Sequence, residues 1–533
     1  MHSTRSLALF AASALFALPS ASGQQMMLEP VCTTVNNPTA VTQPPGESNR
    51  LFVTAKKRGI FVVENGVTLP TLFLDVDDEA AANGGLHTHG LMDMEFHPDY
   101  QTNGKFYISY MDELLFAHVA EYQVSAADPN VANPSTRVQI LGPQAMSFQS
   151  HNFNDLWFGP DGMLYISTGD DEQTGISTVN IGQDLSNYLG KILRLDVDAP
   201  PPYIASGNPF IGVLGADERV FIYGLRQPWR FTYDPVTDDM FIGDVGETSR
   251  EEISSVKFAN AAGANFGWRC AEGTVCTNFL GGCPTGCNAP NFIGPAYEFD
   301  HSDGKCAVIA GDVYRGSDFP AIDGELFFAD YCTSRIWSLT WDGASITNFT
   351  ERTDQLKSIN GVGASFPVSF GTDNAGEMYI VDIGLDVVWK VVPHPCQITN
   401  YCTSTPNSVG AGAVIGSQGS TSVTLNDFVI DVAGGTANQP GLFFYGPNQV
   451  SLPFGNGVQC VGSGALGLFR LNPPLPLDVA GEGSRAVDMT SPPLPAGQIT
   501  AGSEWNFQFW YRDPQGGGAG YNLSDGLSVV FCP

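Results

Sequence analysis

The segment Asp161-Gly162-Met163-Leu164-Tyr165-Ile166-Ser167 decides the fold of this chain. It sets an Asp-Gly turn before a short strand whose residues alternate between two faces, and the strand ends on a hydroxyl side chain. Five further copies lie at residues 48–53, 103–109, 238–243, 323–329 and 375–381. Their matching aromatic residues are Phe52, Tyr107, Tyr165, Phe241, Phe327 and Tyr379. The recurrence predicts six small antiparallel sheets in an all-β protein.

Six such sheets arranged around an axis form a six-bladed β-propeller, which leaves only short strand edges. An array of ordinary β-sandwiches is the alternative, because the copies recur at irregular intervals. The chain becomes rich in Gly, Ser and Thr from about Thr403 onward. We therefore expect a propeller over residues 24–396 and a C-terminal β-sandwich over residues 397–533.

Within this C-terminal region, residues 422–425 and 505–511 are predicted strands. Cys460 and Cys532 are candidates to staple the region. Trp505, Phe507 and Phe509 alternate along the second strand and share one face, a pattern typical of a core. A glycan-binding face that includes Trp505, Phe507, Phe509, Trp510 and Tyr511 is the alternative. Through it the C-terminal region would contact a polysaccharide or a cell surface.

Charge and composition exclude several classes of protein. The 533 residues include 24 Lys and Arg against 55 Asp and Glu, a formal net charge of −31. This balance argues against a nucleic-acid partner, because phosphate binding needs clustered cations. Only 15% of residues are charged, whereas 43% are hydrophobic. The first value argues against a coiled coil and the second against a disordered polymer.

Residues 1–23 have the pattern of a secretory signal peptide, with an apolar stretch and the small residues Ala21-Ser22-Gly23 at its end. Eleven cysteines fit an oxidising compartment. We therefore expect a secreted or periplasmic protein. Because eleven is odd, at least one cysteine stays unpaired within the chain. The four cysteines between Cys270 and Cys287 are expected to form disulfides within one long loop.

Three positions carry candidate chemistry. His151 precedes the third repeat, where an imidazole that faces the mouth of a propeller would suit a general base; a structural histidine is the alternative. Arg226 precedes the fourth repeat and would stabilise a developing oxyanion, if it is not a packing arginine. Carbonyl and side-chain oxygens around Gly246 and Glu247 suit Ca²⁺, with a simple tight turn as the alternative.

An ordered set of motifs resembles the glucose/sorbosone dehydrogenase family. This family includes the soluble pyrroloquinoline-quinone (PQQ) glucose dehydrogenases and the aldose sugar dehydrogenases, and hedgehog-interacting-protein-like proteins share its fold. The motifs lie between about residues 40 and 392 and comprise Gly90-Leu91-Met92, Phe96-His97-Pro98-Asp99-Tyr100, His151-Asn152, Phe158-Gly159-Pro160-Asp161-Gly162 through Gly169-Asp170, Asn187-Tyr188-Leu189-Gly190-Lys191-Ile192-Leu193-Arg194-Leu195-Asp196-Val197, Gly224-Leu225-Arg226 with Pro228-Trp229-Arg230-Phe231, Gly243-Asp244-Val245-Gly246, Asn265-Phe266-Gly267-Trp268-Arg269, Val313-Tyr314-Arg315-Gly316 and Asp330-Tyr331-Cys332. The resemblance implies a six-bladed propeller with its site in the mouth.

The resemblance also implies roles for these residues. His151 would take the proton of a sugar hydroxyl while hydride passes to PQQ, and Arg226 would stabilise charge on the quinone. Asn152 and Gln227 would contact the cofactor, with Gln227 standing where Asn is usual. Main-chain oxygens of Gly246 and Glu247 would face Ca²⁺. The substrate would be an aldose or a related small sugar, and the electron acceptor stays unknown.

Three departures bear on the cofactor. Cys332 stands where the family carries a cofactor-binding Lys, and Ala364 and Phe366 stand where a pair of Arg residues is expected. PQQ carries three carboxylates, and burying them without nearby cations is unfavourable. Arg335 or His301 would have to compensate at the mouth.

Cys306 and Cys332 resemble the disulfide-bearing, hedgehog-interacting-like branch. A propeller binding module without a cofactor, attached through its C-terminal region, is therefore the alternative function.

Overall fold

The computed structural model describes residues 26–77, 89–147, 150–171, 180–277, 283, 287, 289–394, 396–500 and 502–532. The predicted signal segment 1–23 lies outside these residues. The regular structure of the described chain is almost all strand, which confirms the predicted all-β class, and the one α-helix of the described residues, α1 (Tyr100–Asn103), has four residues. No described helix is long and apolar enough to span a bilayer.

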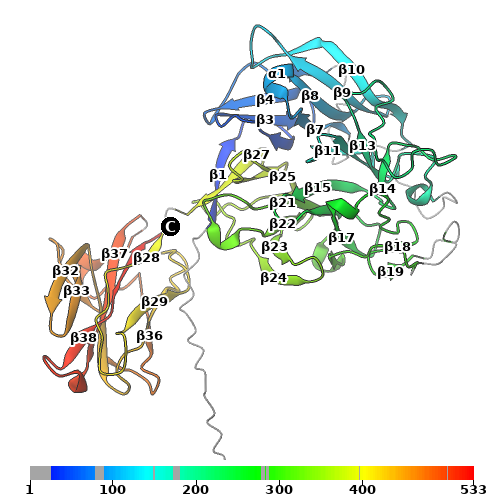
Figure 1. The fold of residues 1–533 in the computed structure, drawn as a ribbon. Helices are drawn as coiled ribbons and strands as arrows, with labels where there is room; N and C mark the ends of the chain where they lie inside the picture. The colour runs from blue at the N-terminus through cyan, green and yellow to red at the C-terminus, as the bar shows by residue number, and fades with distance from the viewer. Residues whose placement is uncertain are drawn as a thin grey trace, which may run out of the picture. The chain divides into compact units, whose positions relative to one another are not determined.

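The chain divides into two compact units, one formed by Met26–Pro393 and one that contains His394–Pro533. The described part of the first unit holds six sheets of at least four strands each (Figure 1). In chain order, the first three sheets are β2 (Pro38–Thr42), β3 (Arg50–Ala55), β4 (Gly59–Glu64), β5 (Val67–Thr68) and β6 (Leu74–Asp75); β7 (Gly90–Phe96), β8 (Lys105–Met111), β9 (Phe116–Val124) and β10 (Ala132–Ala145); and β11 (Phe153–Phe158), β12 (Leu164–Thr168), β13 (Lys191–Leu195) and β14 (Val220–Tyr223). The other three are β15 (Pro228–Asp234), β16 (Asp239–Asp244), β17 (Glu251–Lys257) and β20 (Tyr297–Phe299); β21 (Val308–Val313), β22 (Leu326–Asp330), β23 (Ile336–Trp341) and β24 (Ile346–Glu351); and β25 (Pro367–Thr372), β26 (Met378–Asp382), β27 (Val387–Pro393) and β1 (Met26–Cys32).

Each copy of the sequence repeat forms the second strand of a different sheet. These strands are β3, β8, β12, β16, β22 and β26. All six matching aromatic side chains are buried, with exposures of 0 to 5%. The aromatic position therefore recurs because each sheet needs a large apolar group to pack against its neighbours.

The first strands of the six sheets contact one another in a closed cycle. β2 contacts β7, β7 contacts β11, β11 contacts β15, β15 contacts β21, β21 contacts β25, and β25 contacts β2 again. The last sheet contains both ends of the unit, because β1 pairs antiparallel with β27 from Met26↔Pro393 to Cys32↔Val388. Figure 1 shows blue β1 beside yellow β27.

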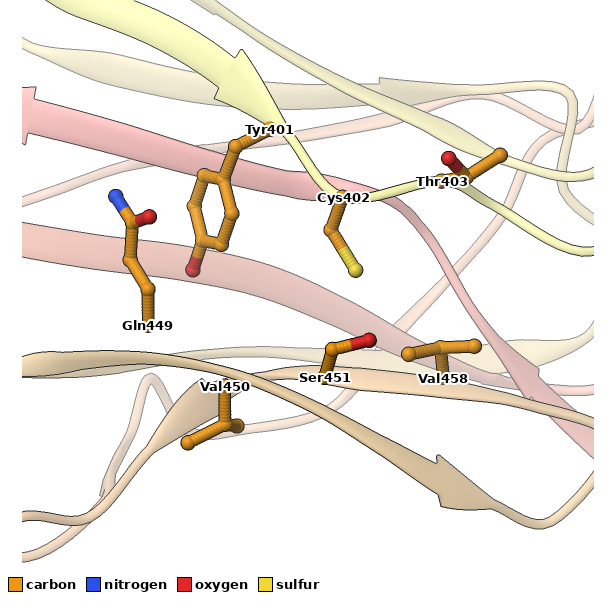
Figure 2. Close-up of a pocket in the computed structure, with 7 residues that line it drawn as sticks. All are labelled: Tyr401, Cys402, Thr403, Gln449, Val450, Ser451 and Val458. Carbon is orange, nitrogen blue, oxygen red and sulfur yellow. The ribbon is translucent and has the colours of Figure 1, made fainter.

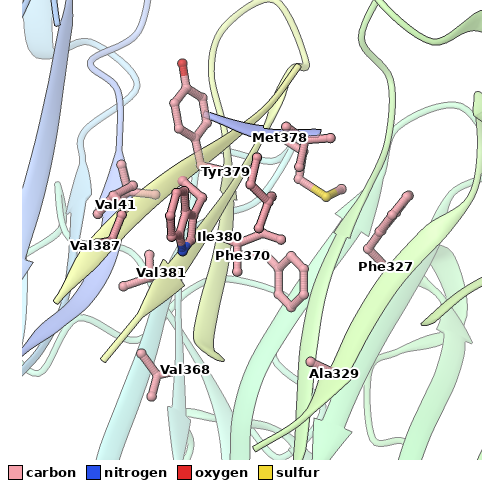
Figure 3. Packing of buried hydrophobic residues seen from close by; sticks show 14 of the residues in the cluster. Val41, Phe327, Ala329, Val368, Phe370, Met378, Tyr379, Ile380, Val381 and Val387 are labelled. Carbon is pink, nitrogen blue, oxygen red and sulfur yellow. The ribbon is translucent and has the colours of Figure 1, made fainter. Parts of the chain in front are cut away.

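Close packing joins the last sheet to the first (Figure 3). Val41 of β2 belongs to the same buried cluster as Phe370 of β25 and Phe327 of β22. Gly371 permits this approach, since a Cβ placed on it would lie 2.6 Å from the carbonyl oxygen of Val41. The absence of a side chain at this position lets β25 and β2 meet.

The unit His394–Pro533 has one larger and one smaller sheet around a common core. The larger sheet contains β28 (Ile398–Tyr401), β39 (Gly526–Val530), β37 (Glu504–Arg512), β31 (Pro440–Gly446), β34 (Phe469–Arg470), β35 (Leu475–Pro476) and β38 (Tyr521–Leu523). The smaller sheet contains β29 (Val414–Gln418), β30 (Val429–Ala433) and β36 (Gly483–Ala486), and a separate hairpin consists of β32 (Asn448–Phe454) and β33 (Gly457–Gly462). Ile415 and Ile430 of the smaller sheet share one cluster with Phe443, Phe507 and Phe509 of the larger sheet.

One expectation for this unit is corrected. Residues 422–425 form a turn and not a strand, because the Ser422 hydroxyl accepts the Leu425 N–H and the chain reverses at Asn426 with a φ of 49°. The expectation that Cys460 and Cys532 cross-link the unit is confirmed, since Cys460 pairs with Cys402 and Cys532 pairs with Cys396.

The four cysteines between Cys270 and Cys287 form disulfides within one long loop, as expected. Cys270 pairs with Cys283 and Cys276 with Cys287, within one loop. Cys306 pairs with Cys332, and Cys32 is the unpaired cysteine, buried in β1.

Gly371→Ala tests the close contact between β25 and β2. We expect the free energy of unfolding to fall by about 1–3 kcal/mol, because the added methyl group overlaps the Val41 carbonyl. Chemical denaturation measures the change. Gly294→Ala is the matched control, since a Cβ at Gly294 meets no atom within 4 Å. Equal stability of the two variants would contradict the proposed close packing.

Candidate active site

His151 lies two residues before the start of β11, with a left-handed φ of 58°. Its side chain is 10% exposed, and its Nδ1 lies 2.6 Å from Oδ1 of Asp170, two residues beyond the end of β12. Gly169 permits this approach. A Cβ there would lie 2.4 Å from the His151 carbonyl oxygen and 2.1 Å from Oε1 of Gln227. The loop before β11 and the loop after β12 therefore meet at a glycine.

Asp170 holds the histidine in one orientation. Its side chain is almost fully buried, and its Oδ2 accepts a hydrogen bond from Nε1 of Trp268 at 2.8 Å. Burial favours the neutral acid, but the hydrogen bond and charge of His151 and the charge of Arg226 lower the pKa of Asp170 below its ordinary value of 3.8. Because an ionised carboxylate only accepts hydrogen bonds, Nδ1 of His151 donates, and Nε2 is the nitrogen that can accept a proton.

Arg226 and Gln227 are positioned by a second buried carboxylate. Both backbone N–H groups donate to Asp244 at the end of β16, at distances of 2.7 to 3.2 Å. Burial raises the pKa of Asp244 to about 7, although these N–H groups and the charge of Arg226 act in the opposite direction. The Arg226 guanidinium donates to the carbonyl of Val245 at 2.9 Å.

Trp268 links the two predicted catalytic residues. The Arg226 guanidinium lies 5.6 Å from the centroid of its ring, while its indole N–H donates to Asp170. The backbone N–H of Asp170 also donates to the Arg226 carbonyl at 2.8 Å. The structure thus brings His151 and Arg226 together through Asp170 and Trp268.

Gln227 and Asn152 are buried beside this group. Gln227 Nε2 donates to Oδ1 of Asn154 at 3.3 Å, while no partner for its Oε1 is found in the described part of the chain. Asn152 Nδ2 lies 4.0 Å from Sδ of Met111, and its carbonyl accepts the N–H of Gly169. Gln227 therefore offers a buried acceptor to a polar group of a ligand.

The turn at Gly246 and Glu247 is organised by Glu272. The backbone N–H groups of Glu247 and the three residues after it all donate to Oε1 of Glu272, at 2.7 to 3.1 Å. Burial disfavours the charge, but these four bonds lower the pKa of Glu272. The turn is therefore held in one conformation. The only convergent cluster of His, Cys, Asp or Glu side chains in the described residues lies elsewhere, so a cation at this turn would depend on main-chain oxygens.

His301 and Arg335 are held by other carboxylates. His301 Nε2 lies 2.8 Å from Oε1 of Glu251, and this hydrogen bond raises the pKa of His301. Glu251 also accepts the N–H of Gly246 at 3.4 Å, so His301 is associated with the Gly246 turn. Arg335 forms a two-pronged ion pair with Glu351. Among the described residues, neither His301 nor Arg335 contacts the His151–Asp170 pair.

The positions where the family resemblance places cations hold a disulfide and apolar side chains instead. Cys332 is bonded to Cys306, and the ring of its neighbour Tyr331 lies 5.1 Å from the ring of Phe366. Ala364 and Tyr331 both pack against the buried cluster that contains Val41 and Phe370. The Arg226 guanidinium therefore fits a carbonyl of PQQ as a donor, whereas these apolar and disulfide-bonded positions do not fit its carboxylates.

Asp170, Asp244 and Trp268 were not assigned roles from the sequence. Each ends or lies within a motif that resembles the family, namely Gly169-Asp170, Gly243-Asp244 and Gly267-Trp268. The signal in each case is a polar or indole residue directly after a glycine. Their contacts join loops of different sheets, which spacing along the chain does not indicate.

Comparisons with known proteins identify the family of this chain. The family described as Glucose / Sorbosone dehydrogenase matches residues 35–363. The HIPL2 protein of Arabidopsis thaliana is 26% identical over 418 residues, which cover 64% of this chain and 58% of that protein. The Hedgehog-interacting protein of Homo sapiens is 30% identical over 236 residues, which cover 40% of this chain and 33% of that protein.

One solved structure, described as the PQQ-bound form of aldose sugar dehydrogenase from Streptomyces coelicolor, aligns with a TM-score of 0.52 at 19% identity. The alignment covers 70% of this chain and 99% of that one, and at this identity it shows a shared fold alone. The chain spans 58 to 61% of the length of the two HIPL proteins that it matches. Since the family match extends over more than half of the chain, this protein belongs to the glucose/sorbosone dehydrogenase family.

Proposed function

We propose that the unit Met26–Pro393 is a six-bladed β-propeller and that the C-terminal unit is a β-sandwich. The closed cycle of first strands supports the propeller, as does the last sheet built from both ends of the unit. The common core of a larger and a smaller sheet supports the sandwich. The boundaries predicted from the sequence, 24–396 and 397–533, stay part of this proposal.

We further propose that the propeller oxidises an aldose or a related sugar in a PQQ- and Ca²⁺-dependent reaction. The observation that carries this proposal is the 2.6 Å contact between His151 Nδ1 and the buried Asp170 carboxylate. A histidine oriented by a buried carboxylate is the arrangement that general-base catalysis requires. The match to the glucose/sorbosone dehydrogenase family, which includes the PQQ glucose dehydrogenases, supports the choice of cofactor.

In this mechanism, Nε2 of His151 accepts the proton of the sugar hydroxyl. Asp170 stabilises the imidazolium that forms and keeps the ring in place, and Trp268 fixes Asp170 from the other side. Arg226 stabilises negative charge that develops beside it. When bound, PQQ would supply the two-electron acceptor for the hydride, and an unknown partner would reoxidise it. Ca²⁺ would bind at the main-chain oxygens of Gly246 and Glu247.

A propeller without a cofactor, of the hedgehog-interacting type, is the second candidate function. The Cys306–Cys332 disulfide and the Tyr331–Phe366 contact favour it, because they occupy the places where cations would hold the carboxylates of PQQ. The relatives named Hedgehog-interacting protein and HIPL2 also support a binding role. In this case Arg226 and Gln227 would contact a partner.

The protein is proposed to be secreted, and the C-terminal unit to contact a glycan or a cell surface. Five disulfides among the described cysteines support an oxidising compartment. Of the aromatic residues considered for a glycan-binding face, Trp505, Phe507, Phe509 and Tyr511 are 4%, 0%, 0% and 0% exposed and lie in the core. Trp510 is partly exposed on the opposite face of the strand.

Calorimetric titration of the purified protein with PQQ in the presence of Ca²⁺ separates the two functions. A sugar dehydrogenase should bind PQQ at about micromolar Kd or tighter and reduce an artificial electron acceptor when an aldose is added. His151→Ala should bind PQQ but lose this reduction. If the wild-type protein does not bind PQQ, the oxidoreductase proposal is wrong and the binding module remains.

Asp170→Asn tests whether His151 depends on its carboxylate. We expect kcat to fall by about 10²- to 10⁴-fold, because an amide neither fixes the required tautomer nor stabilises the imidazolium. Asp354→Asn is the matched control, since Asp354 is 95% exposed and should leave kcat unchanged. Steady-state kinetics with an aldose measure both variants. A kcat for Asp170→Asn within twofold of the control would rule out the proposed dyad.

The lowered pKa of Asp170 also predicts how stability depends on pH. The contribution of the ionised carboxylate is fully present above its unfolded value of about 3.8 and is lost as the pH falls through the lower folded value. The difference in unfolding free energy between wild type and Asp170→Asn should therefore shrink below about pH 4. Urea denaturation from pH 6 downward measures it. A difference that grows on acidification would contradict an ionised Asp170.

A further inference from the structure

An open pocket with a volume of about 610 Å³ lies in the unit His394–Pro533 (Figure 2). Tyr401 at the end of β28 and Thr403 just after it form one wall. Gln449 and Ser451 of β32 and Val458 of β33 form the other. The volume lies within the range of roughly 300–1,000 Å³ that is usual for small-molecule sites.

The two walls are tied together. The disulfide between Cys402 and Cys460 joins the segment after β28 to β33, and the Tyr401 hydroxyl donates to the Cys460 carbonyl at 2.9 Å. Buried Gln508 holds β33 from behind, because its Nε2 donates to the Val458 carbonyl at 2.8 Å. The pocket is therefore preformed, and a ligand would lose little free energy in ordering it.

The ring of Tyr401 lies against the backbone of Gly526 in β39. Tyr401 and Gly526 are directly opposed in the β28–β39 pair, and a Cβ on Gly526 would lie 2.5 Å from Cζ and 2.7 Å from Cε1 of the ring. Only a residue without a side chain lets the ring lie against β39 in this way. Gly526 covers part of the ring, and the rest of the ring lines the pocket.

The polar side chains of the pocket are available to a ligand. Gln449 and Ser451 point from β32 toward Tyr401 and Cys402 (Figure 2), and Val450 between them also lines the pocket. Gln449, Ser451 and Thr403 are exposed, and no hydrogen bond from their side chains to any described residue is found. An amide and two hydroxyls both donate and accept, which suits a ligand that carries several hydroxyl groups.

The pocket is also uncharged. None of its lining residues is Asp, Glu, Lys or Arg, in a chain whose net charge is −31. The lining therefore offers no counter-ion to an ionic ligand, and the overall charge disfavours an anion. An aromatic ring beside uncharged hydroxyl and amide groups matches a pyranose, which has apolar C–H faces and a rim of hydroxyls.

We propose that this pocket binds a neutral oligosaccharide segment. The ring of Tyr401 packs against a sugar C–H face, and Gln449, Ser451 and Thr403 bind its hydroxyls. The pocket is open, so the segment can extend beyond it on either side. The proposal deepens the glycan contact proposed for the C-terminal unit and does not depend on sugar oxidation by the unit Met26–Pro393.

Calorimetric titration of the full chain with cellohexaose, maltohexaose and mannohexaose, without cofactor, tests this site. At least one should bind with a Kd of roughly 1 mM or tighter. The double variant Gln449→Ala/Ser451→Ala should weaken that binding at least tenfold. Val479→Ala is the control, because Val479 lies in the same unit, is 85% exposed and does not line the pocket. Its binding should equal that of wild type.

Two further outcomes decide the proposal. Tyr401→Phe keeps the ring and should retain binding, and His151→Ala should bind as wild type does. The proposal is wrong if none of the three sugars binds at about 10 mM, if the double variant binds as tightly as Val479→Ala, or if His151→Ala abolishes binding. The last result would place the sugar in the unit Met26–Pro393. Failure of the redox assay alone leaves this pocket unaffected.

Discussion

Closure of the ring of first strands is the constraint on which the rest of the unit Met26–Pro393 depends. β25 must meet β2, and Gly371 allows it because no side chain stands between the strand and the Val41 carbonyl. β1 then completes the last sheet by pairing with β27. Because β1 lies in the last sheet and the chain continues from it into β2 of the first, the β1–β27 pairing ties these two sheets together. Within the ring, the sheets that begin with β11 and β15 are neighbours, and their preceding loops carry His151 and Arg226.

The candidate site is built from buried negative charge. Asp170 is compensated by His151, Trp268 and Arg226, whereas Asp244 is compensated mainly by backbone N–H groups. Glu272 is likewise surrounded by four backbone N–H groups. The acidic groups at this site thus have hydrogen-bond partners within the protein, and Arg226 is a cation that lies beside the His151–Asp170 pair. This arrangement suits proton transfer from a neutral sugar, while an anionic cofactor gains few contacts with positive charge.

The local patterns of the sequence predicted the strands well and the long-range contacts less well. The repeat around Tyr165 marks the second strand of all six sheets, because alternation and turn residues are local properties. The sequence also singled out His151 and Arg226, but not the contacts of Asp170 and Trp268 that join them. Those contacts depend on how loops from different sheets meet. Residues 422–425 resembled a strand, yet a serine hydroxyl bound to the backbone favours a turn there.

The sequence also did not predict the partners of individual charged and sulfur-bearing side chains. Arg335 was a candidate cation for the cofactor, but Glu351 on the adjacent strand β24 holds it. Cys460 and Cys532 each bond to a cysteine near the start of the C-terminal unit, where β28 begins and ends. In the same unit, alternation along β37 marked Phe507 and Phe509 as core residues correctly, while the proposed sugar pocket lies among uncharged polar residues that have no comparable pattern.

The central claim is that His151, oriented by Asp170, takes a proton from a sugar while a bound quinone accepts the hydride. The most direct measurement is the absorbance spectrum of the protein mixed with PQQ and Ca²⁺ and then given an aldose without oxygen. The account predicts that the bound quinone is reduced within a single turnover by the wild-type protein and far more slowly by His151→Ala. Equal rates of reduction in the two proteins would contradict it, as would a quinone that passes through gel filtration unbound.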